Sequence, residues 1–184
     1  EANSNAGAAL MSCISTLLLL LIIVAGVSVS WLKVLIFPSL LSIIILALCA
    51  LWLLRNAKAV ENIELIDSRM FSLKEAAIIA GTLTIIQAGI YGLNLLLGDA
   101  GLIAGTLLAS LFEIHAAAAA VVIQGDPTNS TLLYAMILGL GAHAISKSIN
   151  ATLTGGWKFA RVFVPIQMLH MLVLISVLCW ITLR

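Results

Sequence analysis

Charged residues are scarce in this 184-residue sequence, making up 9% of the chain where an ordinary soluble domain carries about 25%. The formal net charge is +1 and no basic stripe occurs, so nucleic acid is not expected as a partner. Cys13, Cys49 and Cys179 stand singly in apolar runs, which indicates membrane-buried residues rather than disulfides or a CxxC metal site. No HExxH or GxSxG spacing occurs, so an enzyme is not predicted.

Hydrophobic residues, by contrast, make up 62% of the chain, and the mean hydropathy is +1.20. Several runs approach the ~20 apolar residues that cross a hydrocarbon core. Because water is absent from that core, backbone groups must pair within each segment, and helices result. We therefore expect an all-α, polytopic transmembrane bundle in contact with the lipid bilayer. Residues 1–184 are expected to form one transmembrane domain, either alone or as the C-terminal part of a longer protein.

Six apolar segments are predicted, separated by polar or glycine-rich turns. Pro38 suits the first turn of the second segment. Ser72 and Glu75 form a capping box that opens the third, and Gly155-Gly156 separates the last two. The segments run over residues 7–30, 38–54, 73–97, 102–124, 131–153 and 159–183.

The fourth segment carries Glu113-Ile114-His115 at its centre, and two interpretations of it stay open. A continuous helix would cross the membrane, whereas a broken helix would enter and return. If all six segments cross, both termini and the basic loop 55–71 share one side, and the excess of lysine and arginine there predicts cytoplasmic termini. If the fourth segment re-enters, Lys158 and Arg161 join that side and the bias grows.

A carboxylate at bilayer depth is costly and marks a candidate functional site. In the fifth segment, His143 and Lys147 are four residues apart and share a helix face. Lys147 lies too far from either end of its segment to extend its amine to the interface. We therefore predict an ion pair between Glu113 and Lys147, either at a transport site or as a structural contact.

Further polar residues extend the candidate site. In the third segment, Thr84, Gln87, Tyr91 and Asn94 follow helical spacing on one face, as pathway lining or as contacts between helices. A divalent cation, held by Glu113, His115 and His143, is one candidate ligand. The predicted pathway comprises Glu113, His115, His143, Lys147, Gln87, Tyr91, Asn94 and Asn150, with Gln167 and His170 as additional lining.

Four stretches carry a family resemblance: FSLKEA at 71–76, YGL at 91–93, GLIAGTLLASLFEIH at 101–115 and AHAISKSINATLTGG at 142–156. Through them the chain resembles an uncharacterised membrane domain found C-terminal to the MgtC/SapB-type domain in bacterial inner-membrane proteins. The resemblance implies an Asp-x-Asp pair where this chain has Glu113-Ile114-His115, and a lysine at Lys147. Because His115 replaces the second carboxylate, the resemblance lends less support to a site of paired carboxylates. It also implies an N-terminal MgtC/SapB-type partner and a role in ion homeostasis.

Two functions follow from these observations. The first is a transporter-like module whose buried polar site handles an ion, a proton or a small polar solute. The alternative is a regulatory or oligomerising membrane domain, in which the buried pair is structural and the helix faces bind a second copy. A transport site must meet water, whereas a structural pair need not.

Overall fold

The computed structural model describes residues 2–55 and 73–182, and these residues form helices joined by short turns. The helices are α1 (Ala2–Val27), α2 (Val29–Arg55), α3 (Leu73–Leu97), α4 (Asp99–Phe112), α5 (Ile114–Ile123) and α6 (Ser130–Thr182). Four of them, α1, α2, α6 and the 80–97 part of α3, are long and apolar enough to cross a membrane. The all-α membrane fold predicted from the sequence is confirmed. The predicted cap residue Ser72 lies outside the described residues.

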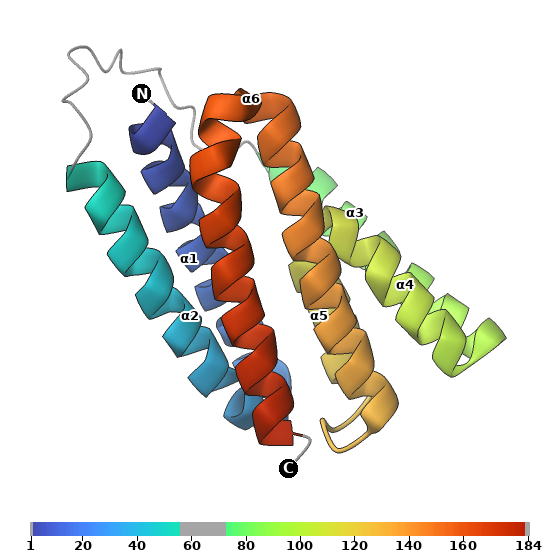
Figure 1. The fold of residues 1–184 in the computed structure, drawn as a ribbon. Coiled ribbons are helices and arrows are strands. Elements are labelled where there is room, and N and C mark those ends of the chain that lie inside the picture. Colours follow the sequence, from blue (N-terminus) through green and yellow to red (C-terminus); the bar gives the residue numbers. More distant parts are fainter. Residues whose placement is uncertain (1, 56–72, 183–184) are drawn as a thin grey trace.

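α1 and α2 form a hairpin that turns at Ser28 (Figure 1). The turn is a single residue long, because helical hydrogen bonding resumes at once: the Leu32 N–H donates to the Ser28 carbonyl at 3.1 Å. α2 therefore begins at Val29, and the prediction that Pro38 opens this segment is wrong. Pro38 lies inside α2 and is buried. A membrane helix tolerates an internal proline because neighbouring helices and hydroxyl side chains satisfy the freed backbone groups.

α6 is itself a hairpin of two long arms, residues 130–155 and 157–182. Its backbone leaves the helix at Gly156, with φ 71° and ψ 171°. This combination is open to glycine alone for practical purposes, since a Cβ would collide with the backbone. The two arms correspond to the fifth and sixth predicted segments, and the predicted turn at Gly155-Gly156 is confirmed (Figure 1).

Replacing Gly156 with alanine is expected to destabilise the protein by about 1–3 kcal/mol through backbone strain. The added Cβ meets no other atom within 4 Å, so strain is the whole effect. Gly141→Ala is the matched control, because its Cβ would be in ordinary contact with Ile175 at 3.9 Å and alanine favours the helix. SDS-induced unfolding in mixed micelles measures both. Equal stability of the two variants would contradict the strain argument.

α4 and α5 form a re-entrant pair. The 14 residues of α4 extend only ~21 Å, short of the ~30 Å hydrocarbon core. The start of α4 and the end of α5 lie at the same end of the bundle. There the Thr131 hydroxyl donates to Asp99 Oδ2 at 2.8 Å, and Trp31 Nε1 donates to the Gly125 carbonyl at 2.7 Å. Residues 102–124 therefore enter the bundle and return without crossing it (Figure 1).

The turn after α5 carries a charge at this end of the molecule. The Thr128 N–H donates to Asp126 Oδ1 at 3.1 Å, and this hydrogen bond lowers the pKa of the exposed Asp126 carboxyl. A carboxyl kept ionised in this way belongs in water. The Asp126 turn therefore marks an aqueous end of the bundle.

Re-entry of the fourth segment changes the topology of the whole chain. Because α4 and α5 together make no crossing, the N-terminal and C-terminal ends lie at opposite ends of the bundle (Figure 1). The prediction that both termini share one side of the membrane does not follow from this arrangement. It rested on counting six crossings, and hydropathy alone does not distinguish a crossing segment from one that turns back.

Small residues allow α4 to approach the first arm of α6 closely. A Cβ built on Gly139 would lie 2.7 Å from Ser110 Oγ and 3.2 Å from Thr106 Cγ2. Such contacts replace the hydrophobic effect as the cause of helix association in lipid. In α5, the five alanines at 116–120 are buried and serve the same purpose.

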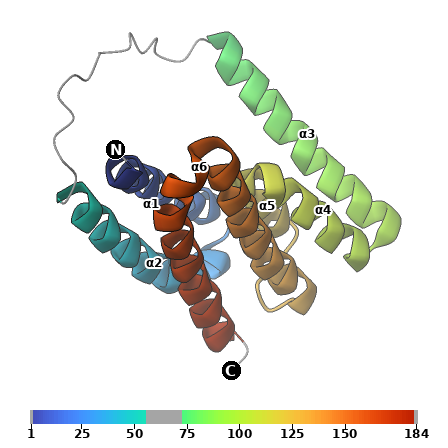
Figure 2. The ribbon, with the colours of Figure 1, turned by 45° about the horizontal axis from the view of Figure 1, so that its top comes forward.

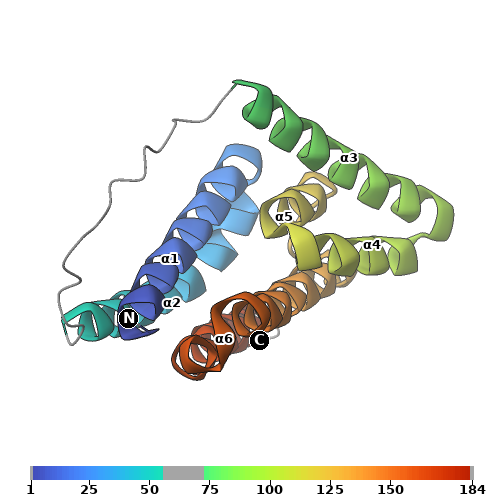
Figure 3. The ribbon, with the colours of Figure 1, turned by 90° about the horizontal axis from the view of Figure 1, so that it is seen from above.

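α3 lies at the edge of the molecule (Figures 2 and 3). It packs against α4 and α5, while α1, α2 and the arms of α6 form the other side of the bundle. Large side chains such as Ile85, 74% exposed, and Leu96, 81% exposed, face outward from α3. α3 therefore contributes less to the core than the other membrane-spanning helices.

Candidate functional site

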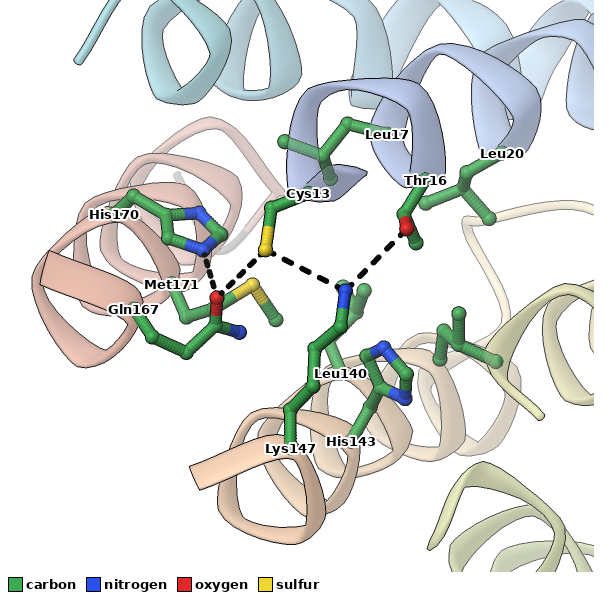
Figure 4. Close-up of a pocket in the computed structure, with 11 residues that line it drawn as sticks. Cys13, Thr16, Leu17, Leu20, Leu140, His143, Lys147, Gln167, His170 and Met171 are labelled. Atoms are coloured by element: carbon green, nitrogen blue, oxygen red, sulfur yellow. Dashed lines mark hydrogen bonds between the residues drawn. The ribbon is translucent and has the colours of Figure 1, made fainter. Parts of the chain in front are cut away.

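Polar side chains from three helical segments meet at a small internal cavity of about 20 Å³ (Figure 4). This volume exceeds the ~10–15 Å³ that one water molecule needs. Leucine, isoleucine and methionine form the rest of the wall. The polar lining consists of Cys13 and Thr16 from α1, His143 and Lys147 from the first arm of α6, and Gln167 and His170 from the second arm.

Lys147 contacts neutral groups in this cavity. Its Nζ lies 3.4 Å from Thr16 Oγ1 and 3.5 Å from Cys13 Sγ. The predicted ion pair with Glu113 is wrong, because Glu113 is bonded to His115 instead. The sequence placed both charges at similar depth, but the direction in which the tip of the α4–α5 pair points depends on packing. The ammonium group is thus held without a carboxylate partner in the described part of the chain.

A buried network continues from Cys13 to α2. The Cys13 thiol donates to Gln167 Oε1 at 3.3 Å, and His170 Nε2 lies 3.0 Å from the same oxygen. On the other side of the ring, His170 Nδ1 lies 2.8 Å from Ser42 Oγ. Since a carbonyl oxygen only accepts, Nε2 of His170 donates to Gln167. The Ser42 hydroxyl also donates to the His170 backbone carbonyl at 3.0 Å. Gln167, His170 and Ser42 are each at most 2% exposed, so this network rigidly joins α1, α2 and α6.

Glu113 and His115 form a second polar unit, at the tip of the re-entrant pair. Glu113 has extended backbone angles, φ −149° and ψ 106°, and its Oε1 caps α5 by accepting from the His115 N–H at 2.9 Å. The same oxygen lies 2.5 Å from His115 Nδ1, and His115 Nε2 lies 3.0 Å from the Thr16 carbonyl. Because that carbonyl only accepts, Nε2 carries a proton, and Nδ1 and the carboxylate share one more.

The Thr16 residue connects the two units. Its carbonyl accepts from the His115 ring, and its hydroxyl accepts from Lys147. Thr16 lies near the middle of α1, so the break between α4 and α5 lies near the middle of the bundle. Thr16, Cys13 and Ser42 were not predicted as site residues, because isolated hydroxyl and thiol groups are common in membrane helices and carry little signal.

His143 is held by one ring nitrogen. Its Nδ1 lies 3.2 Å from the Ser110 carbonyl, while the buried Nε2 has no hydrogen-bond partner in the described residues. Glu113, His115 and His143 do not form the predicted metal centre, because the described residues contain no group of three or more histidine, cysteine or acidic side chains placed to hold a metal ion. Glu113 and His115 are bonded to each other, whereas His143 is bonded to the Ser110 carbonyl.

The polar face predicted on α3 lies elsewhere. Gln87, Tyr91 and Thr84 line a separate hollow of about 280 Å³ against α5, and Asn94 is bonded to the Gln124 side chain. Their common face on α3 is real, but that face turns toward the end of α5 and not toward the cavity.

Asn150 is also outside the cavity. It is exposed on the first arm of α6, and its carbonyl accepts from the Thr154 hydroxyl at 2.7 Å. Gln167 and His170, by contrast, line the cavity as the sequence predicted. Helical spacing therefore predicted cavity-lining residues on both arms of α6. It also included Asn150, about one turn beyond Lys147, which does not line the cavity.

Long apolar helices around a buried polar cluster define this chain as an integral membrane protein of the helical-bundle class. Residues 1–155 match the family described as a domain of unknown function, DUF4010, and the chain belongs to that family. No curated protein and no solved structure matches the chain. The family resemblance seen in the sequence is thereby confirmed, and the adjacent MgtC/SapB-type domain stays a prediction.

Proposed function

We propose that this chain is a transporter-like membrane module whose buried polar site handles an ion, a proton or a small polar solute. The observation that carries the proposal is the break between α4 and α5 at Glu113, near the middle of the bundle. A helix broken at this depth presents unpaired backbone groups and a helix dipole to the interior, and several transporter folds bind their cargo at such breaks.

The position of Lys147 supports the same function. A lysine inside a membrane bundle is costly and is retained mainly on pathways for ions, protons or substrates. Here it faces a cavity and contacts Thr16 and Cys13, which are neutral. A purely structural lysine would be expected to pair with a carboxylate. The small cavity fits a closed conformation, from which cargo is released when the helices move apart.

Flux through proteoliposomes tests this function. Purified protein is reconstituted, and gradients of protons, alkali cations and halides are applied in turn while dye or electrode signals follow their decay. We expect at least one gradient to decay faster than in protein-free vesicles, and Lys147→Met to abolish the difference. Lys158→Gln is the matched control, since Lys158 is exposed and outside the cavity. Absence of flux for every gradient would contradict the proposal.

Orientation in the membrane follows from the basic residues at the two ends of the bundle. The end of α2, which holds Arg55, and the turn of α6, near Lys158 and Arg161, lie at the same end of the bundle as the start of α1 (Figure 1). The start of α2, near Lys33, lies at the opposite end. The positive-inside rule then assigns the first end to the cytoplasm of a bacterial inner membrane. The C-terminal end of α6 accordingly faces the other compartment.

Cysteine labelling in intact cells checks this orientation. Thr128→Cys and Trp157→Cys each introduce a thiol at an exposed turn, at opposite ends of the bundle. A membrane-impermeant maleimide should label Thr128→Cys in intact cells and Trp157→Cys only after permeabilisation. The reverse pattern would overturn the assignment. Labelling of both variants in intact cells would contradict a membrane crossing by residues 130–155, which lie between the two labelled positions.

A second candidate function, an oligomerising or regulatory domain, is favoured by α3. Tyr91 is 56% exposed, and both Tyr91 and Gln87 present polar groups at a helix edge where lipid offers no hydrogen bond. A second copy of the chain or an MgtC/SapB-type domain would satisfy them. Cross-linking in native membranes separates the two functions: Gln87→Leu would reduce an oligomer without affecting flux.

A further inference from the structure

The chemistry of the cavity wall points to the charge of its ligand. Of the described residues that line the cavity, none is acidic, and Lys147 provides a positive charge. Cations in proteins are bound by carboxylates and carbonyl oxygens, which this wall does not direct inward. Lys147 and the Gln167 amide both offer N–H donors at this wall, and donors around a positive charge favour an anion.

Two donors are only partly used. The Lys147 ammonium has three N–H groups, and its contacts to Thr16 Oγ1 and Cys13 Sγ are long, at 3.4 and 3.5 Å. Gln167 is 1% exposed and uses its Oε1 twice, for Cys13 and His170, while its Nε2 has no hydrogen bond to any described residue. Gln167, Met171 and Lys147 all line the cavity, and Figure 4 shows the Met171 side chain between the Gln167 amide and the Lys147 amine in this view.

A ligand in the cavity would accept a hydrogen bond from this amide. His143 Nε2 is a buried atom at the same wall without a hydrogen-bond partner in the described residues, and it becomes a donor when the ring is protonated. The three groups come from both arms of α6, so a ligand between them would also join the arms.

We propose that the cavity binds a small monovalent inorganic anion of the halide class, held by Lys147 Nζ and Gln167 Nε2. This inference rests on the transport function proposed above and names the class of its cargo. The volume of about 20 Å³ is close to that of a single water-sized group, which excludes organic anions in this conformation. The Thr16 hydroxyl holds the Lys147 amine by a hydrogen bond. The Glu113 carboxylate caps α5 and is bonded to His115, so it does not pair with Lys147.

Broadening of the ³⁵Cl nuclear magnetic resonance line measures chloride binding directly on the purified protein in detergent. We expect wild-type protein to broaden the line beyond detergent alone, and bromide to compete. Lys147→Gln should weaken binding by roughly ten-fold or more, since a charge-assisted hydrogen bond contributes ~1.5–3 kcal/mol. Lys158→Gln, which changes a lysine outside the cavity, should bind as wild type does.

Gln167→Glu makes the test independent of misfolding. The substitution keeps the shape of the side chain and places a carboxylate beside Lys147, as a tethered substitute for the anion. We expect this variant to retain its melting temperature, while chloride broadening is lost. Broadening that is absent in wild type, or equal in wild type, Lys147→Gln and Gln167→Glu, would overturn the inference.

Flux measurements separate this inference from the transport function itself. Proton or cation flux without chloride broadening would refute the anion and leave the transport function standing. Chloride broadening that depends on Lys147, in a protein without any flux, would refute transport and with it the role of chloride as cargo. Chloride flux that Gln167→Glu abolishes and Lys158→Gln does not would support both.

Discussion

Glu113→Gln is expected to reduce flux through proteoliposomes by roughly ten-fold or more, as loss of an acid–base group does, while the bundle stays folded. Glutamine keeps an oxygen that accepts from the His115 backbone N–H, at 2.9 Å in the native protein. The cap of α5 therefore survives. The negative charge, and the proton shared between carboxylate and imidazole, are removed from the tip of the re-entrant pair.

Glu113→Ala provides the structural comparison. Loss of an N-cap costs ~1 kcal/mol, and leaving His115 Nδ1 without its partner costs about 1–3 kcal/mol more, so a loss of ~2–4 kcal/mol is expected in SDS-induced unfolding. If the glutamine variant unfolds as easily as the alanine variant and transports as well as wild type, the Glu113–His115 unit is structural only.

The largest loss of stability is expected for Trp31→Ala, at about 3–5 kcal/mol. Trp31 is fully buried at the turn between α1 and α2, and its Nε1 donates to the Gly125 carbonyl at 2.7 Å. The side chain therefore packs the α1–α2 hairpin and also anchors the end of α5. In lipid the loss comes from packing contacts and the hydrogen bond, since lipid itself is apolar.

Two further variants separate the contributions of Trp31. Trp31→Phe keeps most of the ring volume and loses the hydrogen bond, so about 1 kcal/mol is expected. Trp157→Ala removes a tryptophan that is 67% exposed and should change the free energy of unfolding by less than about 0.5 kcal/mol. Unfolding by SDS followed by circular dichroism measures all three, and equal losses for Trp31→Ala and Trp157→Ala would contradict the assigned packing.

The local pattern of apolar and polar residues was enough to predict the helices and several of the residues at which they begin or end. Long apolar runs must become helices in lipid, because each segment has to satisfy its own backbone. α3 extends over Leu73–Leu97 as predicted, and the chain turns at Gly156 where two glycines interrupt the apolar run. Polar residues in the middle of apolar runs also pointed correctly to His143 and Lys147 as lining of one cavity.

The partners of those residues depended on tertiary packing. Hydropathy places Glu113 and Lys147 at similar depth but carries no information on the direction in which each side chain points. A backbone break turns Glu113 back onto the first turn of α5 and toward His115, and Lys147 is left with Thr16 and Cys13. The same limit applies to the fourth segment: its apolar composition suits the membrane whether it crosses or returns, and only its contacts at Trp31 and Asp99 decide that it returns.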